Sequence, residues 1–311
     1  MKDFLLKNSD LKRVYFLLPV LLFTGFLIIF IANILIKIWI QGNQVSISPI
    51  NTSKSFQYPV IKTNFIPIIS ATGAIIMDAD SKVVLYSKNP DLRFSPASTT
   101  KLMTALTALD YFKPQDILTV KIASREGSII GLFSGESLTL ENLIYAMLLP
   151  SANDAAFAIA QNYREGHDQF IEKMNQKAKK LELLNTHYGD PAGLLDSQSY
   201  TTAFDLARLA SFAVSNPLIK EIVATKEKVI TDTTGTVVYR IENLNELLGI
   251  NGVNGVKTGY TQEAGQVLVT SKIEKGKTII IVIMGSEDRF LDTQKLLDLV
   301  HENLSFLSIH P

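Results

Sequence analysis

Cysteine is absent from the 311 residues of this chain. Its absence excludes disulfides, thiolate nucleophiles and metal sites with cysteine ligands. Histidine is scarce as well, and the four that are present are scattered as His167, His187, His301 and His310. A zinc centre needs clustered His and carboxylate ligands, and a Ser-His-Asp hydrolase needs a histidine beside its nucleophile, so neither class is favoured. We therefore expect no metal and no cofactor.

A charge excess of either sign is also lacking. Lys and Arg together number 30, as do Asp and Glu, and residues 41–311 carry 25 basic against 28 acidic side chains. Domains that bind nucleic acids concentrate Lys and Arg on one face and are strongly basic. The sequence thus gives no reason to expect a nucleic-acid partner.

One long uncharged run is present at residues 14–36, which is enough for a helix to cross ~30 Å of hydrocarbon. Residues 1–13 hold four basic and two acidic side chains, so the positive-inside rule keeps them in the cytoplasm and exports the rest. A cleaved signal peptide is the alternative, but residues 37–41 offer no small-x-small cleavage site. The sequence predicts a cytoplasmic tail (1–13), a single-pass signal-anchor helix in the cell membrane (14–36) and a proline-broken linker (37–70).

Strand patterns lie at both ends of the exported part, and helical patterns lie in its middle. Short runs rich in β-branched residues predict strands at residues 74–78, 83–86, 117–120, 229–230, 237–239, 266–270 and 278–283. Apolar residues at helical spacing predict helices that start near residue 98 and at residues 140–148, 154–160, 170–178, 203–210 and 291–304. This order favours an α+β (α/β) fold with one antiparallel sheet built from both chain ends, flanking helices and an inserted, mostly helical subdomain.

A serine and a lysine stand one helical turn apart at the start of the first of these helices. Ser98 and Lys101 are three residues apart, so both can face the same way. A helix start supplies free N–H groups and a partial positive charge, and a neutral amine could take the serine proton. The spacing alone is common, because Ser9 and Lys12 share it, and Ser98 could simply cap the helix.

Two further short motifs follow in the sequence. Ser151 and Asn153 form a Ser-x-Asn motif on a predicted bend between two helices, and Lys257, Thr258 and Gly259 form a triplet predicted to begin an edge strand. A glycine in such a strand allows close approach of a substrate backbone. Each motif alone is ordinary, but the three in this order form the signature set of penicillin-recognising serine enzymes.

The chain resembles the D-alanyl-D-alanine carboxypeptidases, the serine-type low-molecular-mass penicillin-binding proteins. The resemblance covers roughly residues 70–305 and includes the three motifs and the segments at 185–194 and 202–207. It implies a β-lactamase/transpeptidase-like fold, with the catalytic domain at residues 71–305 and a short tail at 306–311. Many relatives carry an added β-rich domain and a carboxy-terminal anchor, so here the amino terminus is expected to anchor the protein.

The resemblance also implies a mechanism on the peptidoglycan stem peptide. Ser98 would attack the carbonyl of the penultimate D-alanine, Lys101 would take its proton, and Ser151 would relay a proton to the leaving nitrogen. Asn153 would hold the peptide, and Lys257 would add positive potential. An unperturbed lysine is protonated at pH 7, so burial beside a second cation is expected to lower the pKa of Lys101.

Further residues match the family's binding positions. The backbone N–H groups of Ser98 and Tyr260 would form the oxyanion hole, and Gly259 would belong to the substrate-binding residues. Thr258 and Arg289 would recognise the terminal carboxylate of the substrate. β-Lactam antibiotics would act as covalent inhibitors by acylating Ser98.

Three alternatives share the motifs. A serine β-lactamase is one, although its Glu-x-x-Leu-Asn loop is not matched by residues 182–185, which are one residue too short. An endopeptidase that cuts D-alanyl cross-links would use the same residues on a longer substrate. An anchored sensor that binds without turnover would keep the fold, but the presence of both Ser98 and Lys101 favours an enzyme.

Overall fold

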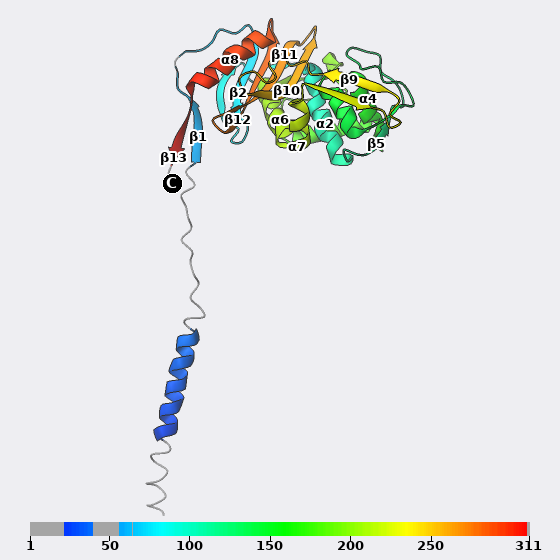
Figure 1. Cartoon of the computed structure of the whole chain (residues 1–311). Helices are drawn as coiled ribbons and strands as arrows, with labels where there is room; N and C mark the ends of the chain where they lie inside the picture. Colours follow the sequence, from blue (N-terminus) through cyan, green and yellow to red (C-terminus); the bar gives the residue numbers. More distant parts are fainter. Residues whose placement is uncertain (1–21, 40–55, 64, 310–311) are drawn as a thin grey trace, which may run out of the picture. The chain divides into compact units, whose positions relative to one another are not determined.

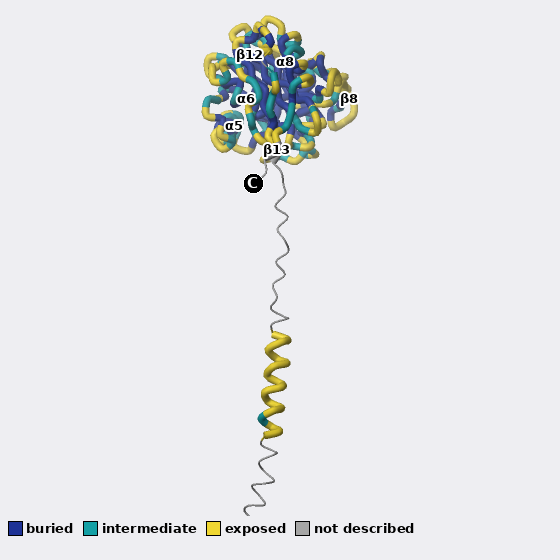
Figure 2. The backbone as a smooth tube through the Cα atoms, turned by 90° about the vertical axis from the view of Figure 1, so that its left-hand side faces the viewer, coloured by how far each residue is buried: buried dark blue, intermediate teal, exposed yellow. Residues whose placement is uncertain are grey.

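The computed structural model describes residues 22–39, 56–63 and 65–309, which belong to two separate units. The first unit contains the helix Leu22–Trp39, an 18-residue apolar segment whose side chains are almost all exposed (Figure 2). Its length and composition are compatible with a membrane span. Residues 14–21 of the predicted span lie outside the described residues, and the helix continues to Trp39, three residues past its predicted end.

The second unit is the folded domain, which contains strands and helices along its whole length (Figure 1). Its strands are β1 (Phe56–Ile61), β2 (Gly73–Asp78), β3 (Val84–Lys88), β4 (Arg93–Phe94), β5 (Ile117–Thr119), β6 (Ser137–Thr139), β7 (Thr201–Thr202), β8 (Glu227–Thr231), β9 (Val238–Glu242), β10 (Val253–Thr261), β11 (Gly265–Glu274), β12 (Lys277–Ser286) and β13 (Leu304–Ile309). Its helices are η1 (Ala97–Thr99), α2 (Thr100–Tyr111), α3 (Leu140–Leu148), α4 (Asn153–Asn162), α5 (His167–Lys180), η2 (Asp196–Gln198), α6 (Ala203–Ser215), α7 (Pro217–Val223) and α8 (Arg289–Asn303), of which η1 and η2 are 3₁₀ turns.

The central sheet has five strands in the order β10-β11-β12-β2-β3, and every neighbouring pair is antiparallel. Strands β2 and β3 come from the start of the domain, whereas β10, β11 and β12 come from its final third. The predicted sheet built from both chain ends is therefore confirmed. Strand β10 is an edge of this sheet, so one side of its backbone is free of a partner strand.

Side-chain alternation along the strands gives the sheet two apolar faces. In the β2–β12 pairing, Ile76 faces Ile281, and both pack with Leu296 of α8. One position along, Ile75 and Val282 pack into the cluster that also holds the buried residues of α2 to α7. Successive residues of a strand point to opposite faces, so the sheet is buried between α8 on one side and the inserted helices on the other (Figure 1).

Helix α2 lies within the helical half and is buried along its first nine residues. It packs against α3, α4, α5 and α6, and its amino-terminal end meets β10 through η1. Its apolar residues and its three buried threonines are thus enclosed by neighbouring elements. This burial fixes the position of the turn that carries Ser98.

The chain ends differ from the sequence prediction. The predicted linker (37–70) contains strand β1, and the predicted tail (306–311) falls largely in β13, which pairs antiparallel with β1. Pro59 suggested a linker, but proline is tolerated in a two-stranded ribbon that leaves one side of each strand unpaired. Ile61 and Phe306 of this ribbon pack against the α8 side of the core. The domain thus begins at Phe56, before residue 71.

Candidate active site

Ser98 lies in the 3₁₀ turn η1, immediately before α2, and so slightly earlier than the predicted helix start. Ala97 has a positive φ of 47°, and the Thr99 hydroxyl donates to the Pro96 carbonyl at 2.5 Å, which holds the turn. Neither η1 nor α2 has a side-chain cap. The Ser98 hydroxyl therefore does not serve as a helix cap, and the simple structural explanation of this serine fails.

Lys101 is fully buried, and its Nζ lies 2.8 Å from Ser98 Oγ. The same nitrogen donates to the Ala192 carbonyl, also at 2.8 Å. Burial lowers the pKa of Lys101 to about 7, although the negative charges of Asp190 and Asp154 act in the opposite direction. A neutral amine next to the serine hydroxyl is therefore abundant near neutral pH.

The loop that supplies the Ala192 carbonyl is organised by Asp190, a residue to which the sequence analysis gave no role. Its two carboxylate oxygens accept the backbone N–H groups of four consecutive residues, Ala192 to Leu195, at 2.7–2.9 Å. Gly193 has φ +79°, and a Cβ there would lie 1.9 Å from the Ala97 carbonyl oxygen. The Asp-Pro-x-Gly sequence was a readable turn signal, but only the fold shows which amine it faces.

The Ser-x-Asn motif lies on the predicted bend between α3 and α4. Ser151 is buried and has a positive φ of 66°. The Asn153 amide donates to the Glu126 carbonyl at 2.8 Å, and its backbone N–H donates to the Ser128 carbonyl at 2.7 Å. Its Oδ1 is buried without a hydrogen-bond partner among the described residues. A buried amide oxygen without a partner can accept a bond from a bound peptide.

The Lys-Thr-Gly triplet lies in the second half of β10 and does not begin the strand as predicted. A Cβ at Gly259 would be only 3.3 Å from the Ala97 Cβ and 3.4 Å from the Ser98 backbone nitrogen. The glycine thus lets the edge strand closely approach the turn that carries Ser98. The backbone of Ser98 and the backbone of β10 near Gly259 therefore lie close together.

Lys257 is buried, and its Nζ donates only to the Thr258 carbonyl among the hydrogen bonds of the described residues, at 3.1 Å. Its pKa is well below the usual lysine value because of burial first, and then because of the positive charges of Lys101 and Arg289. The positive charge of Lys101 thus opposes protonation of Lys257, whereas the lowered pKa of Lys101 comes from burial and not, as expected, from the second cation. The structure therefore brings both predicted lysines into one electrostatic unit.

Arg289 begins α8 on the other face of the sheet edge. Its Nη1 donates to the Gly259 carbonyl at 3.0 Å, while its Nε is buried without a partner among the described residues. Thr258 is buried, and the side chain of Tyr260 is 65% exposed. The guanidinium is thus attached to the strand that carries the triplet, and one of its donors remains available.

Asp196 is a second residue that the sequence analysis missed. Its Oδ1 accepts hydrogen bonds from the Ser95 hydroxyl and, at 3.1 Å, from the Thr261 hydroxyl. It thereby joins the segment before Ser98 to the end of β10. No motif in the sequence indicated this connection.

Fold and site together define a class, that of serine hydrolases in which a buried lysine amine accompanies the nucleophile. In the described part of the chain, no group of three or more His, Cys, Asp or Glu side chains could hold a metal ion. A model of the D-alanyl-D-alanine carboxypeptidase family matches residues 61–288. The chain belongs to this family, and the resemblance noted in the sequence is confirmed.

Known relatives agree with this assignment. The chain is 34% identical over 239 residues to the D-alanyl-D-alanine carboxypeptidase DacF of Bacillus subtilis, a match covering 73% of this chain and 61% of that protein. It is 33% identical to a D-alanyl-D-alanine endopeptidase of Escherichia coli, covering 74% of this chain and 77% of the relative. The crystal structure of the Streptomyces K15 DD-transpeptidase superimposes with a TM-score of 0.71 at 33% identity, covering 76% of this chain and 98% of that one.

Proposed function

We propose that this protein is a serine-type D-Ala-D-Ala carboxypeptidase that removes the terminal D-alanine from peptidoglycan stem pentapeptides. The observation that carries the proposal is the 2.8 Å contact between Lys101 Nζ and Ser98 Oγ, made by a buried amine whose pKa is about 7. A nucleophile with an adjacent base is the requirement for covalent acyl transfer. Family membership supplies the substrate class.

In the proposed reaction, the Ser98 oxygen attacks the carbonyl carbon of the penultimate D-alanine and its proton passes to Lys101. The tetrahedral oxyanion accepts hydrogen bonds from the backbone N–H groups of Ser98 and Tyr260, an interaction worth about 3 kcal/mol per donor. The C–N bond then breaks, and Ser151 relays a proton to the leaving D-alanine amine. Water hydrolyses the acyl-enzyme and regenerates Ser98.

Substrate recognition is assigned to Asn153 on the helical side of the site and to Lys257, Thr258 and Arg289 on the sheet side. Asn153, whose Oδ1 is free to accept, would bind the backbone N–H of the stem peptide. Arg289 would supply positive potential for the terminal carboxylate, with the Thr258 hydroxyl and the Lys257 amine, whose pKa is lowered, as further hydrogen-bond donors. Two observations support this role of Arg289. Its positive charge lowers the pKa of Lys257, and its Nη1 donates a hydrogen bond to the Gly259 carbonyl.

A second candidate function is endopeptidase activity on D-alanyl cross-links. Two relatives that are 32% and 33% identical to this chain are named D-alanyl-D-alanine endopeptidase. The same nucleophile and base would serve, but the leaving group would be an amide-linked residue without a free carboxylate. The two functions therefore differ at Arg289 and Thr258.

The proposal includes the location of the enzyme. The apolar helix Leu22–Trp39 would anchor it in the cell membrane, with its amino terminus in the cytoplasm and the catalytic domain outside. Peptidoglycan lies on that side of the membrane. β-Lactams would enter the same site and acylate Ser98, because their strained amide reacts with the activated hydroxyl.

Covalent labelling tests the nucleophile. A fluorescent penicillin should label the full chain, and Ser98→Ala should abolish the label while Ser95→Ala, three residues away, retains it. Equal labelling of Ser98→Ala and the parent would refute the assignment. Slow loss of the label would separate a carboxypeptidase from a β-lactamase, which must deacylate fast.

Substrate choice separates the two peptidase functions. A pentapeptide ending in D-Ala-D-Ala should lose one D-alanine, and its carboxy-terminal amide should react about 10–150-fold more slowly, because a charged hydrogen bond contributes about 1.5–3 kcal/mol. Arg289→Ala should remove most of this preference. Equal cleavage of the free acid and a cross-linked substrate by the parent would favour the endopeptidase.

A further inference from the structure

Three neighbouring apolar side chains are strongly exposed between β1 and β2. Phe65 is 70% exposed, Ile66 69% and Ile68 89%. We call these three residues the apolar segment. Single exposed apolar side chains are normal on soluble domains and need no explanation, as at Ile122 or Leu184. Three within four positions, with no charged residue from 63 to 77, form a patch of the kind that marks an interaction surface.

The domain holds these side chains outward. Pro67 and Ile69, which lie between and after them, are buried. The Ile68 carbonyl accepts a hydrogen bond from Lys295 of α8 at 2.8 Å, and the Ile69 carbonyl accepts one from Lys88 of β3 at 3.1 Å. The backbone is thus pinned to the domain from two sides. The exposed side chains cannot turn into the core without breaking these contacts.

The connection between β1 and β2 that carries the apolar segment runs beside α8 (Figure 1). Residues of the apolar segment and of α8 line one surface groove. The groove has a volume of about 540 Å³ and is lined on one side by the apolar segment and Pro67. The α8 residues that line it are Lys295, Asp298, Leu299, Glu302 and Asn303. The site formed by Ser98 and β10 includes none of the residues that line the groove. This surface therefore has no part in the proposed chemistry.

The length of the tether indicates what covers this surface. Sixteen residues, 40–55, separate the apolar helix from β1, and even fully extended they span no more than ~55 Å. The six residues of β1 add ~20 Å before the apolar segment is reached. An anchored domain on so short a tether meets the bilayer at high effective concentration.

We propose that Phe65, Ile66 and Ile68 insert into the interfacial region of the lipid bilayer, so that the catalytic domain rests on the membrane that anchors it. The inference rests on the proposed membrane anchor. Apolar and aromatic side chains partition into this region of a bilayer. Lys62, which is exposed at the border of the segment, fits the anionic headgroups there.

The absence of cysteine allows a direct test with the full-length chain. Single cysteines are introduced as Ile28→Cys in the apolar helix, Ile68→Cys in the apolar segment and Ile122→Cys, a 72% exposed site in the connection between β5 and β6. Each variant carries a nitroxide spin label and is reconstituted in phosphatidylethanolamine–phosphatidylglycerol vesicles. Collisions with oxygen, which concentrates in lipid, are compared with collisions with a water-soluble nickel chelate.

The expected ratio of oxygen to nickel accessibility at position 68 is several-fold above that at position 122 and approaches that at position 28. A water-like ratio at 68 with a lipid-like ratio at 28 would overturn the docking proposal and leave the anchor intact. A water-like ratio at 28 would refute the anchor and the docking together. A label at 68 shielded from both reagents would show a protein partner or a second copy instead of lipid, and would also refute the proposal.

A second variant controls for effects of the label itself. Lys62→Cys carries the label beside the segment, and the triple change Phe65→Ser, Ile66→Ser and Ile68→Ser is added to it. The serines should move the label at 62 to a water-like ratio while penicillin labelling of Ser98 persists, which reports that the domain is folded. An unchanged ratio at 62 would contradict the role of the three side chains.

Discussion

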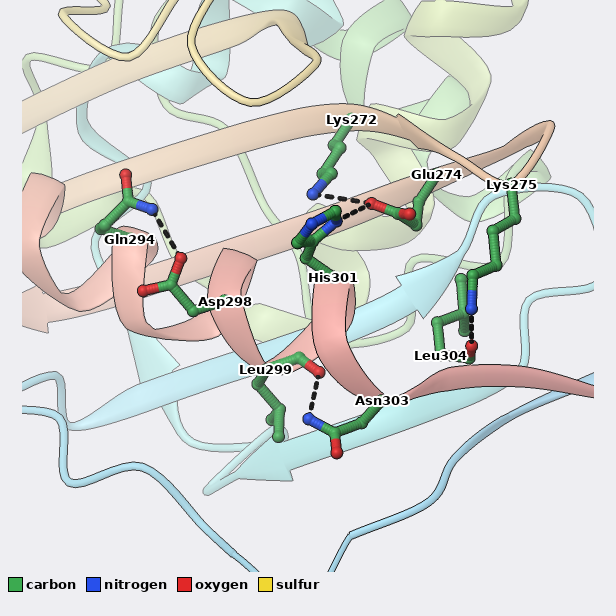
Figure 3. A network of polar contacts seen from close by, with 9 residues as sticks. All are labelled: Lys272, Glu274, Lys275, Gln294, Asp298, Leu299, His301, Asn303 and Leu304. Carbon is green, nitrogen blue, oxygen red and sulfur yellow. Dashed lines mark hydrogen bonds and ion pairs between the residues drawn. The ribbon is translucent and has the colours of Figure 1, made fainter.

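Two buried lysines of the same domain have opposite surroundings. Lys272 of β11 is 2% exposed, and its Nζ lies 2.8 Å from the Glu274 carboxylate, which His301 also contacts (Figure 3). Lys101 is also buried, yet within the described part of the chain it donates only to the Ser98 hydroxyl and the Ala192 carbonyl. One lysine has an anionic partner, and the other has neutral ones.

Burial therefore has a different effect on protonation at Glu274 and at Lys101. At Glu274, burial alone would raise the pKa, but the hydrogen bonds and positive charges of Lys272 and His301 outweigh it and lower the pKa. Glu274 therefore stays ionised near neutral pH, and its contact with His301 joins β11 to α8. At Lys101, desolvation is not offset by a bonded carboxylate, so the amine can release its proton. A carboxylate in contact with Lys101 would instead favour the protonated amine.

The largest effect is expected when Lys101, the buried lysine without an anionic partner, is replaced. Lys101→Arg keeps the positive charge but removes an amine that can become neutral, so the rate of Ser98 acylation should fall by at least ~100-fold, the scale of general-base catalysis. Lys272→Arg is the matched control and should leave the rate nearly unchanged. Stopped-time labelling with fluorescent penicillin measures both, and a similar loss in the two variants would contradict the assignment.

The second-largest effect is expected when Lys272 loses its anionic partner. Glu274→Gln leaves Lys272 buried without its anion, which should lower the free energy of unfolding by about 3 kcal/mol. For a domain of this size the melting temperature should fall by about 6–12 °C, while acylation at 25 °C persists. Asp298→Asn, on the exposed face of α8, is the control and should change little. A melting temperature equal to that of the parent would show that the pair is dispensable.

The same pair predicts an acid sensitivity. Because the folded-state pKa of Glu274 lies below its ordinary value of about 4.3, its stabilisation is complete above that pH and is lost as pH falls through the folded-state pKa. The parent should therefore lose more stability than Glu274→Gln below about pH 4.3. Urea unfolding at several pH values would measure the difference.

A third, smaller effect is the dependence of the acylation rate on pH, which should differ in origin from the role of Lys272. With a Lys101 pKa of about 7, the neutral amine becomes abundant as pH rises. The acylation rate should therefore increase about tenfold between pH 6 and pH 8, with its midpoint near 7. The midpoint should be the same in Lys272→Arg. A flat profile over this range would mean that another group accepts the proton.

The smallest effect concerns the link between the two halves of the site. Asp196→Ala removes the acceptor shared by Ser95 and Thr261, and the loss of a hydrogen bond of this kind costs about 1 kcal/mol. Acylation should slow about fivefold, without a shift of its pH midpoint, because no group in contact with Lys101 has changed. A displaced midpoint would show that Asp196 acts on the base itself.

Local geometry explains what the sequence could predict. Ser98 and Lys101 are one helical turn apart, so their proximity needs no knowledge of the tertiary fold. The bend that carries Ser151 follows from the proline before it. The central sheet followed from strand patterns at both ends of the chain. These features depend on residues close in sequence or on strong periodicity.

The features that were missed depend on contacts between distant segments. The Ala192 carbonyl meets Lys101 across 91 positions, and no local pattern encodes that distance. Strand β1 pairs with β13 across the whole domain, so Pro59 was interpreted as part of a linker. The sequence predicts a strand that begins at the Lys-Thr-Gly triplet, whereas β10 begins at Val253.

Ser98 and Lys101 belong to one short stretch of η1 and α2, whereas Gly259 and Arg289 belong to the sheet side of the site. If the helical side and the sheet side separate slightly in a slow motion, the Ser98 hydroxyl and the Lys101 amine move together. Only the distance of these two groups from β10 then changes. Acyl groups of increasing bulk would then weaken the polarisation of the carbonyl without disturbing deprotonation of the serine. Inhibitors of different size should differ in their rates of reaction and still share one dependence on pH.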